Sequence, residues 1–130
     1  MTSNPIWLQR TTVEELNSSK NSLVDHLGIE MLEIGDDFIK ARMPVDHRTV
    51  QPMTRVLHGG ASVSLAETLG STRAFLCVDA SKYFVAGLEI NANHVRAVRD
   101  GWVTGDGCRA TAASGTHHAA LGNSHHRPGR

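Results

Sequence analysis

The residues with the clearest chemical potential are a histidine, two glycines and a glutamate near the middle of the chain. His58 is followed directly by Gly59 and Gly60, and Glu67 comes seven residues after Gly60. Paired glycines immediately before a helix leave its first N–H groups open to close approach, and the helix dipole there favours negative charge. We therefore expect the Gly60 N–H to stabilise an oxyanion, such as the one that forms when a carbonyl carbon is attacked.

Glu67 is a candidate general base or nucleophile because its helical neighbours, Ser64 and Ser71 among them, are small and uncharged. A glutamate facing solvent normally has charged neighbours. The alternative is a glutamate on an exposed helix edge, and taken alone this residue fits that description better. His58 taken alone is likewise more often a hydrogen-bonding residue at a helix entry than a catalyst. The two residues together indicate an active site.

The spacing of these groups implies a second subunit. Seven residues of helix place Glu67 about 10 Å beyond Gly60 along the axis, which is long for two groups that act on one carbonyl. A two-fold axis could bring Gly60 of one subunit close to Glu67 of the other. We therefore expect an isologous homodimer with shared sites.

These groups need a helix and a sheet to position them. Residues 61–78 lack proline and carry Leu65, Leu69 and Leu76 on one stripe, which predicts a long helix. Apolar residues alternate on both sides of the turn at residues 35–37, which predicts a hairpin. The remaining expected elements are short helices over residues 12–17 and 21–27, a long strand over residues 83–95, and a strand that begins at Trp102. This order predicts an α+β fold in which the helix lies across an antiparallel sheet.

Composition limits the other possibilities. The 130 residues fit one domain, and the 13 basic and 13 acidic side chains balance, so no basic field attracts nucleic acid or anionic lipid. No apolar run approaches the roughly 18 residues of a membrane span. Two cysteines form no framework, and residues 1–5 do not resemble a secretion signal, so we expect a cytoplasmic protein without metal or cofactor.

Several motifs together resemble the hotdog-fold acyl-CoA thioesterases of the phenylacetate-degradation type, and within that group the bacterial aromatic thioesterases of menaquinone and enterobactin biosynthesis. The resemblance covers about residues 5 to 105, and we expect residues 1–105 to form an incomplete hotdog domain. The motifs are Pro44-Val45-Asp46-x-Arg48-Thr49, Gln51-Pro52, His58-Gly59-Gly60-Ala61-Ser62, Ala66-Glu67-x-x-Gly70-Ser71 and Gly87-Leu88-Glu89-Ile90-Asn91-Ala92-Asn93-His94.

The resemblance implies a helix wrapped by a curled antiparallel sheet, and homodimers often paired into homotetramers. It implies hydrolysis of a small, aromatic or short aliphatic acyl-CoA or acyl-carrier-protein thioester. Carried over by position, Glu67 is the catalytic carboxylate, Gly60 the carbonyl-polarising amide and His58 the residue that orients the loop. Gln51 binds the thioester or water, although it stands one residue farther from His58 than the resemblance implies. The remaining site residues are Ser71, which supports the nucleophile or water, and Gly59, Ser64 and His94, which contact substrate; His94 as a core histidine is the alternative.

Three other functions fit the sequence less well. A serine hydrolase also uses His-Gly-Gly loops, but the chain has no Gly-x-Ser-x-Gly motif. A metal site would need His117, His118, His125 and His126, and adjacent histidine pairs without periodicity provide no preorganised geometry. A hotdog module that binds acyl thioesters without hydrolysing them would have little need for Glu67.

The last part of the chain, residues 106–130, changes in character. Leu121 is its only large aliphatic residue, and no period of 2 or 3.6 persists. A disordered tail is one interpretation. Read one nucleotide later with free wobble bases, Ala110 through Arg127 can instead encode Leu-Leu-Leu-His-Leu-Gly-Arg-Thr-Thr-Gln-Leu-Trp-Glu-Ile-Arg-Ile-Thr-Asp, which alternates like a strand. We favour a frameshift, natural or from sequencing, between about Gly105 and Ala110, which removes two C-terminal strands of the hotdog sheet.

We expect the printed chain to be unstable or inactive, and a chain with the restored frame to be an active thioesterase. Each large apolar side chain left uncovered forfeits about 1.5–3 kcal/mol of burial, against a total stability of about 5–15 kcal/mol. Resequencing the codons from Gly105 to Ala110 tests the frameshift itself. Urea unfolding and thiol release from benzoyl-CoA test its consequence; robust hydrolysis by purified protein ending at Arg130 would contradict it.

Overall fold

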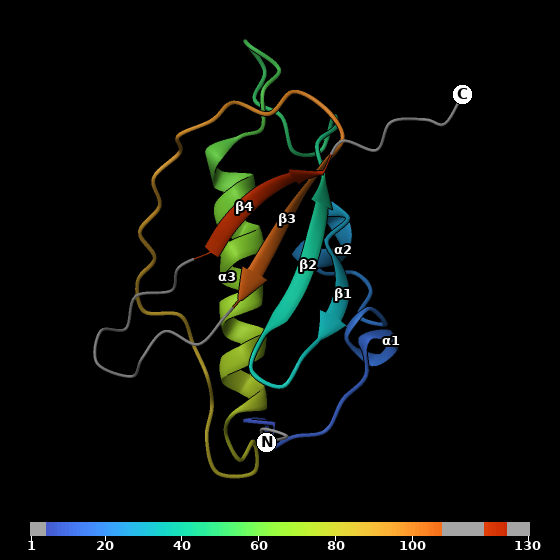
Figure 1. Cartoon of the computed structure of the whole chain (residues 1–130), viewed down its shortest axis with the longest axis vertical. Helices are drawn as coiled ribbons and strands as arrows, with labels where there is room; N and C mark the ends of the chain where they lie inside the picture. The colour runs from blue at the N-terminus through green and yellow to red at the C-terminus, as the bar shows by residue number, and fades with distance from the viewer. Residues whose placement is uncertain (1–4, 108–118, 125–130) are drawn as a thin grey trace.

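A computed structural model describes residues 5–107 and 119–124 of the chain. The elements are α1 (Val13–Leu16), α2 (Leu23–Leu27), β1 (Glu30–Ile34), β2 (Ile39–Pro44), α3 (Gly59–Leu76), β3 (Trp102–Gly107) and β4 (Ala119–Ser124). The strands form one antiparallel sheet in the order β1-β2-β3-β4, and α3 lies along the sheet (Figure 1). The α+β prediction, with one long helix against an antiparallel sheet, is confirmed.

The two short helices follow local capping rules. The Thr12 hydroxyl accepts a hydrogen bond from the Glu15 backbone N–H, and the Glu15 carboxylate accepts one from the Thr12 N–H, which is the capping box expected from the sequence. In α2, the Ser22 side chain caps the first turn and Gly28 ends the helix with a left-handed φ of 69°. The Arg48 guanidinium packs against Gly28, where any Cβ would meet it at 2.7 Å.

The sheet presents an alternating apolar face to α3. Ile39, Ala41 and Met43 of β2 are fully buried. Opposite Ala41, Gly105 of β3 lies so close to the helix that a Cβ there would stand 2.7 Å from Leu69 Cδ1. This glycine therefore sets how near the helix comes to the sheet.

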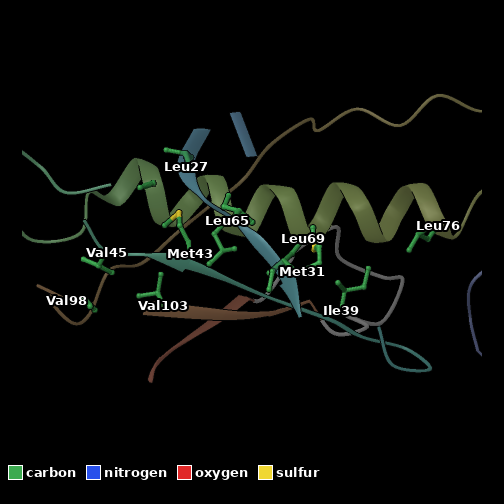
Figure 2. Packing of buried hydrophobic residues seen from close by; sticks show 13 residues of the cluster. Leu27, Met31, Ile39, Met43, Val45, Leu65, Leu69, Leu76, Val98 and Val103 are labelled. Atoms are coloured by element: carbon green, nitrogen blue, oxygen red, sulfur yellow. The ribbon is translucent and has the colours of Figure 1, made fainter. Parts of the chain in front are cut away.

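Helix α3 contributes the other half of the core. Leu65, Leu69 and Leu76 are at most 2% exposed and point toward β2 and β3 (Figure 2). This is the stripe expected from the sequence. The helix begins two residues earlier than predicted, at Gly59, because the His58 side chain caps it.

The strand predicted over residues 83–95 is wrong. These residues form no strand, and across residues 84–97 no backbone group is hydrogen-bonded to another backbone group of the described chain. The segment returns along α3, on the side away from β1 and β2 (Figure 1). Alternating apolar residues give a strand only where a neighbouring strand supplies hydrogen-bond partners, and here none is adjacent.

The disordered tail expected from residue 106 onward contains regular structure in two places. β3 continues to Gly107, and β4 occupies Ala119–Ser124 and pairs with β3 over its full length. Strand pairing uses backbone N–H and C=O groups, so an edge strand can be extended by a segment without an apolar pattern. Residues 108–118 and 125–130, with much of the proposed frameshift, lie outside the described residues.

Across residues 5–107 and 119–124, no helix combines the length and the apolar character needed to cross a bilayer.

Candidate functional site at the start of α3

The first turn of α3 is held by its own capping histidine. The Gly60 N–H donates to His58 Nδ1 at 2.8 Å, and the His58 carbonyl accepts from the N–H groups of Ala61 and Ser62. The Gly60 N–H therefore already has an acceptor, unlike the free oxyanion donor expected from the sequence. Among the described residues nothing accepts a hydrogen bond from the Gly59 N–H, so this amide is the donor available at the helix start.

A buried loop fixes the position of His58. The His58 N–H donates to the Thr49 carbonyl at 2.8 Å, and Leu57 N–H donates to the Val98 carbonyl at 2.7 Å. Thr49 is 1% exposed, and its hydroxyl donates to the Pro44 carbonyl at 2.7 Å. The end of β2, the loop and the entry to β3 thus converge on the residue that caps α3.

An ion pair reinforces the same loop. Arg48 Nη2 lies 2.7 Å from Asp46 Oδ2, and the Arg48 backbone N–H also donates to Asp46. The hydrogen bonds from the Arg48 guanidinium lower the pKa of Asp46 from 3.8 to about 2, against the opposing effect of burial. Asp46 and Arg48 belong to the motif that carried the family resemblance, and their contacts give that motif a structural role.

Gln51 does not reach the start of the helix. Its side-chain amide donates to the Thr54 hydroxyl and its carbonyl oxygen accepts from the Met53 N–H at 3.2 Å, so both ends are used within its own loop. The loop turns back at Arg55, which has a left-handed φ of 58°.

Glu67 and Ser71 lie one turn apart on α3. The Ser71 hydroxyl donates to Glu67 Oε1 at 3.3 Å, and both residues are half-buried. The backbone at Gly87 covers the carboxylate so closely that a Cβ there would overlap Glu67 Oε1. The carboxylate is therefore held against protein on a helix face and does not extend into bulk solvent.

His94 lies over the start of the helix, near Gly59. A Cβ on Gly59 would meet the His94 ring at 3.0 Å, and His94 Nε2 lies 2.8 Å from the Ser62 hydroxyl. Ser62 is 2% exposed, and its hydroxyl donates to the Gly59 carbonyl at 2.8 Å. Sequence reasoning missed Ser62 and Gly87 as site residues. Both residues belong to the motifs that carry the family resemblance, but only the fold shows what they contact.

Ser64, expected to contact substrate, donates its hydroxyl to the Gly60 carbonyl at 2.8 Å and thus closes a local helix contact. Within the described ranges, no group of three or more His, Cys, Asp or Glu side chains could hold a metal ion. The histidines weighed as metal ligands, at positions 117, 118, 125 and 126, lie outside those ranges.

The sequence matches one family and several characterised relatives. A family model described as thioesterase superfamily matches residues 55–116, which include the start of α3 and Glu67. The 1,4-dihydroxy-2-naphthoyl-CoA hydrolase of Escherichia coli is 50% identical over 101 residues, or 77% of this chain and 73% of the relative. The proofreading thioesterase EntH of Cronobacter turicensis is 52% identical over 101 residues, or 77% of this chain and 72% of the relative.

The structural comparison agrees with the sequence matches. A crystal structure of a thioesterase from Haemophilus influenzae superposes with a TM-score of 0.75 at 53% identity, over 79% of this chain and 71% of the other. The similarity thus extends to the arrangement of α3 on the sheet.

The Asp46 ion pair predicts a specific acid dependence of stability. Because the folded-state pKa is depressed, the contribution is present above pH 3.8 and is lost as pH falls toward about 2. With the Asp46 side chain 33% exposed, solvent screening reduces the contribution to about 1 kcal/mol. Urea unfolding should therefore show Asp46→Asn destabilised at neutral pH, with the difference from the unsubstituted chain vanishing at the acid end. Asp37→Asn, in the exposed hairpin turn, is the control; equal effects of the two substitutions would contradict the prediction.

Proposed function

Starting from the premise that the chain belongs to the thioesterase superfamily, with the hotdog fold, we propose that it hydrolyses a small aromatic acyl-CoA or acyl-carrier-protein thioester to a free acid and a thiol. The observation that carries the proposed chemistry is the Glu67 carboxylate, half-buried on α3, hydrogen-bonded by Ser71 and covered by Gly87. A half-buried carboxylate in such a position is suited to act as a base or nucleophile.

In the proposed mechanism, the start of α3 stabilises the negative charge on the substrate, and Glu67 activates water. The thioester carbonyl oxygen accepts a hydrogen bond from the Gly59 N–H, where the helix dipole also favours the developing negative charge. As general base, Glu67 takes a proton from water while the oxygen attacks the carbonyl carbon. The tetrahedral intermediate then expels the thiolate, which takes up the proton held by Glu67. The free acid and the thiol then leave the site. In the second version, Glu67 itself attacks the carbonyl carbon and expels the thiolate, and water then hydrolyses the mixed anhydride to release the acid and regenerate the Glu67 carboxylate.

The proposed site is completed by a second subunit. Gly59 and Glu67 of one chain are separated by about 12 Å of helix, which is more than a thioester carbonyl and its attacking group can span. The segment over residues 84–97 supports a homodimer, because its backbone lacks partners within the described chain. Phe84, Leu88 and Val95 on this segment are at least 94% exposed, and an adjacent strand of a second copy would cover them. Pairing of such dimers into a homotetramer is the further assembly that the resemblance implies.

The aromatic acyl group is proposed from the relatives. The Escherichia coli relative is named for a naphthoyl-CoA substrate, and half of the matched residues are identical in this chain. The other candidate function, a module that binds acyl thioesters without hydrolysing them, does not require the Ser71 contact to Glu67. A cytoplasmic location, where acyl-CoA is made and used, fits the proposed reaction.

Substitution of the carboxylate distinguishes these two functions. In the frame-restored chain, Glu67→Gln should lower kcat for thiol release from benzoyl-CoA by about 10²- to 10⁴-fold, because the base is lost while the side-chain shape is kept. Glu14→Gln on the exposed side of α1 is the matched control and should leave kcat unchanged. Thiol release that persists in the Glu67→Gln protein would remove Glu67 from the mechanism.

Shared sites predict complementation between two inactive variants. Glu67→Gln and His58→Ala homodimers should each be inactive, since each lacks one half of every site. Mixed dimers, formed by unfolding and refolding the two proteins together, should regain up to about half of the unsubstituted rate per dimer, because one intact site reassembles. The measurement is thiol release against the mixing ratio. Mixtures that stay as inactive as the parents would argue for sites built within one chain.

A further inference from the structure

The Ser62 hydroxyl makes two contacts that together require a proton on His94 Nε2. Its oxygen lies 2.8 Å from the Gly59 carbonyl oxygen and 2.8 Å from His94 Nε2. A hydroxyl has one proton to give. Since the Gly59 carbonyl can only accept, the serine proton is directed there, and the second contact is a hydrogen bond only if His94 Nε2 carries a proton and donates it.

The same reasoning applies at the other end of the Gly59–Gly60 peptide. The Gly60 N–H can only donate, and it points at His58 Nδ1 from 2.8 Å. His58 Nδ1 must therefore offer a lone pair, and the neutral imidazole must carry its proton on Nε2. His58 is exposed, so this Nε2–H is accessible at the start of α3.

The contacts form one chain of hydrogen bonds with a single direction. His94 Nε2–H donates to Ser62, and the Ser62 hydroxyl donates to the Gly59 carbonyl. The N–H of the same peptide unit, on Gly60, donates to His58 Nδ1. A hydrogen bond to a peptide carbonyl polarises its N–H, so each bond strengthens the next.

We propose that His94 is a positioning residue that acts through Ser62 and the Gly59–Gly60 peptide to hold His58 in its Nε2–H tautomer. The inference rests on the proposed function for its catalytic meaning, because it explains how the chain keeps two donors, the Gly59 N–H and the His58 Nε2–H, at the helix start. It also gives the buried Ser62 a role. His94 here acts on the donors and not on the substrate.

The test is a long-range ¹H–¹⁵N spectrum of the histidine rings in the full printed chain, at a pH of about 8, where an ordinary imidazole is neutral. The His58 signals are assigned by their loss in His58→Asn. In the unsubstituted protein His58 should appear as the Nε2–H tautomer, with Nδ1 unprotonated. His58 with a protonated Nδ1 would overturn the proposal, and this readout needs His58→Asn only to assign the signals.

Substitutions along the hydrogen-bond chain test the direction in which its donors point. Ser62→Ala and His94→Ala should each shift the His58 ring toward a mixture of tautomers and speed hydrogen exchange of the Gly60 amide about 1.5-fold, because the Gly60–His58 hydrogen bond is kept and loses only the strengthening of about 10–30% from its neighbours. The double substitution should add little to either one, since both break the same chain. His94→Gln, which keeps an N–H donor, should return the His58 tautomer and the Gly60 exchange rate close to those of the unsubstituted protein.

The matched control is Thr68→Val, which removes another hydroxyl that donates within α3, to the Ser64 carbonyl at 2.7 Å. It should leave the His58 ring and the Gly60 exchange rate unchanged. Equal changes from Thr68→Val and Ser62→Ala, or none from Ser62→Ala, would refute the proposal. Neither readout needs hydrolysis, so an intact hydrogen-bond chain in a frame-restored protein that does not cleave thioesters would refute the proposed function alone.

Discussion

The packing of Leu65 and Leu69 against β2 and β3 is the constraint on which the rest of the structure depends. Both leucines are at most 1% exposed, and Gly105 lets the helix approach the sheet. At about 100° per residue, Glu67 points roughly 160° away from each of them. Gly60, seven residues earlier, returns to within about 20° of Glu67. Burial of the leucines therefore turns the chemical groups to the opposite face, where the segment over residues 84–97 covers part of them.

The second requirement is a well-defined start for that helix. The Thr49 carbonyl accepts a hydrogen bond from the His58 N–H, and the Val98 carbonyl accepts one from the Leu57 N–H. The His58 ring accepts one from the Gly60 N–H and so caps the first turn. Among the described residues, the backbone N–H groups of the first turn thus have acceptors except for that of Gly59. An amide with no acceptor from residues 5–107 and 119–124 is suited to anion binding at a helix N-terminus.

The segment over residues 84–97 connects the fold to the proposed assembly. It carries His94 and Gly87 against the helix, while Phe84, Leu88 and Val95 face outward. A backbone without hydrogen-bond partners among the described residues and an outward apolar row are features of a segment that can pair with another chain. The proposed division of the reaction between Gly59 and Glu67 of different subunits would use that same segment, so that catalysis and dimerisation depend on one surface.

The sequence by itself determined what is written in local patterns. The capping box at Thr12, the hairpin around residues 35–37 and the leucine stripe of α3 follow from short-range spacing, and the hotdog resemblance followed from motifs that also named Glu67 and His58. Only the tertiary structure decided which groups meet. Gly60 proved to be bound by His58, and Gln51 by its own loop. The physical reason is that an N–H or an amide is identical in sequence whether or not an acceptor stands 3 Å away, and that acceptor is placed by chain packing.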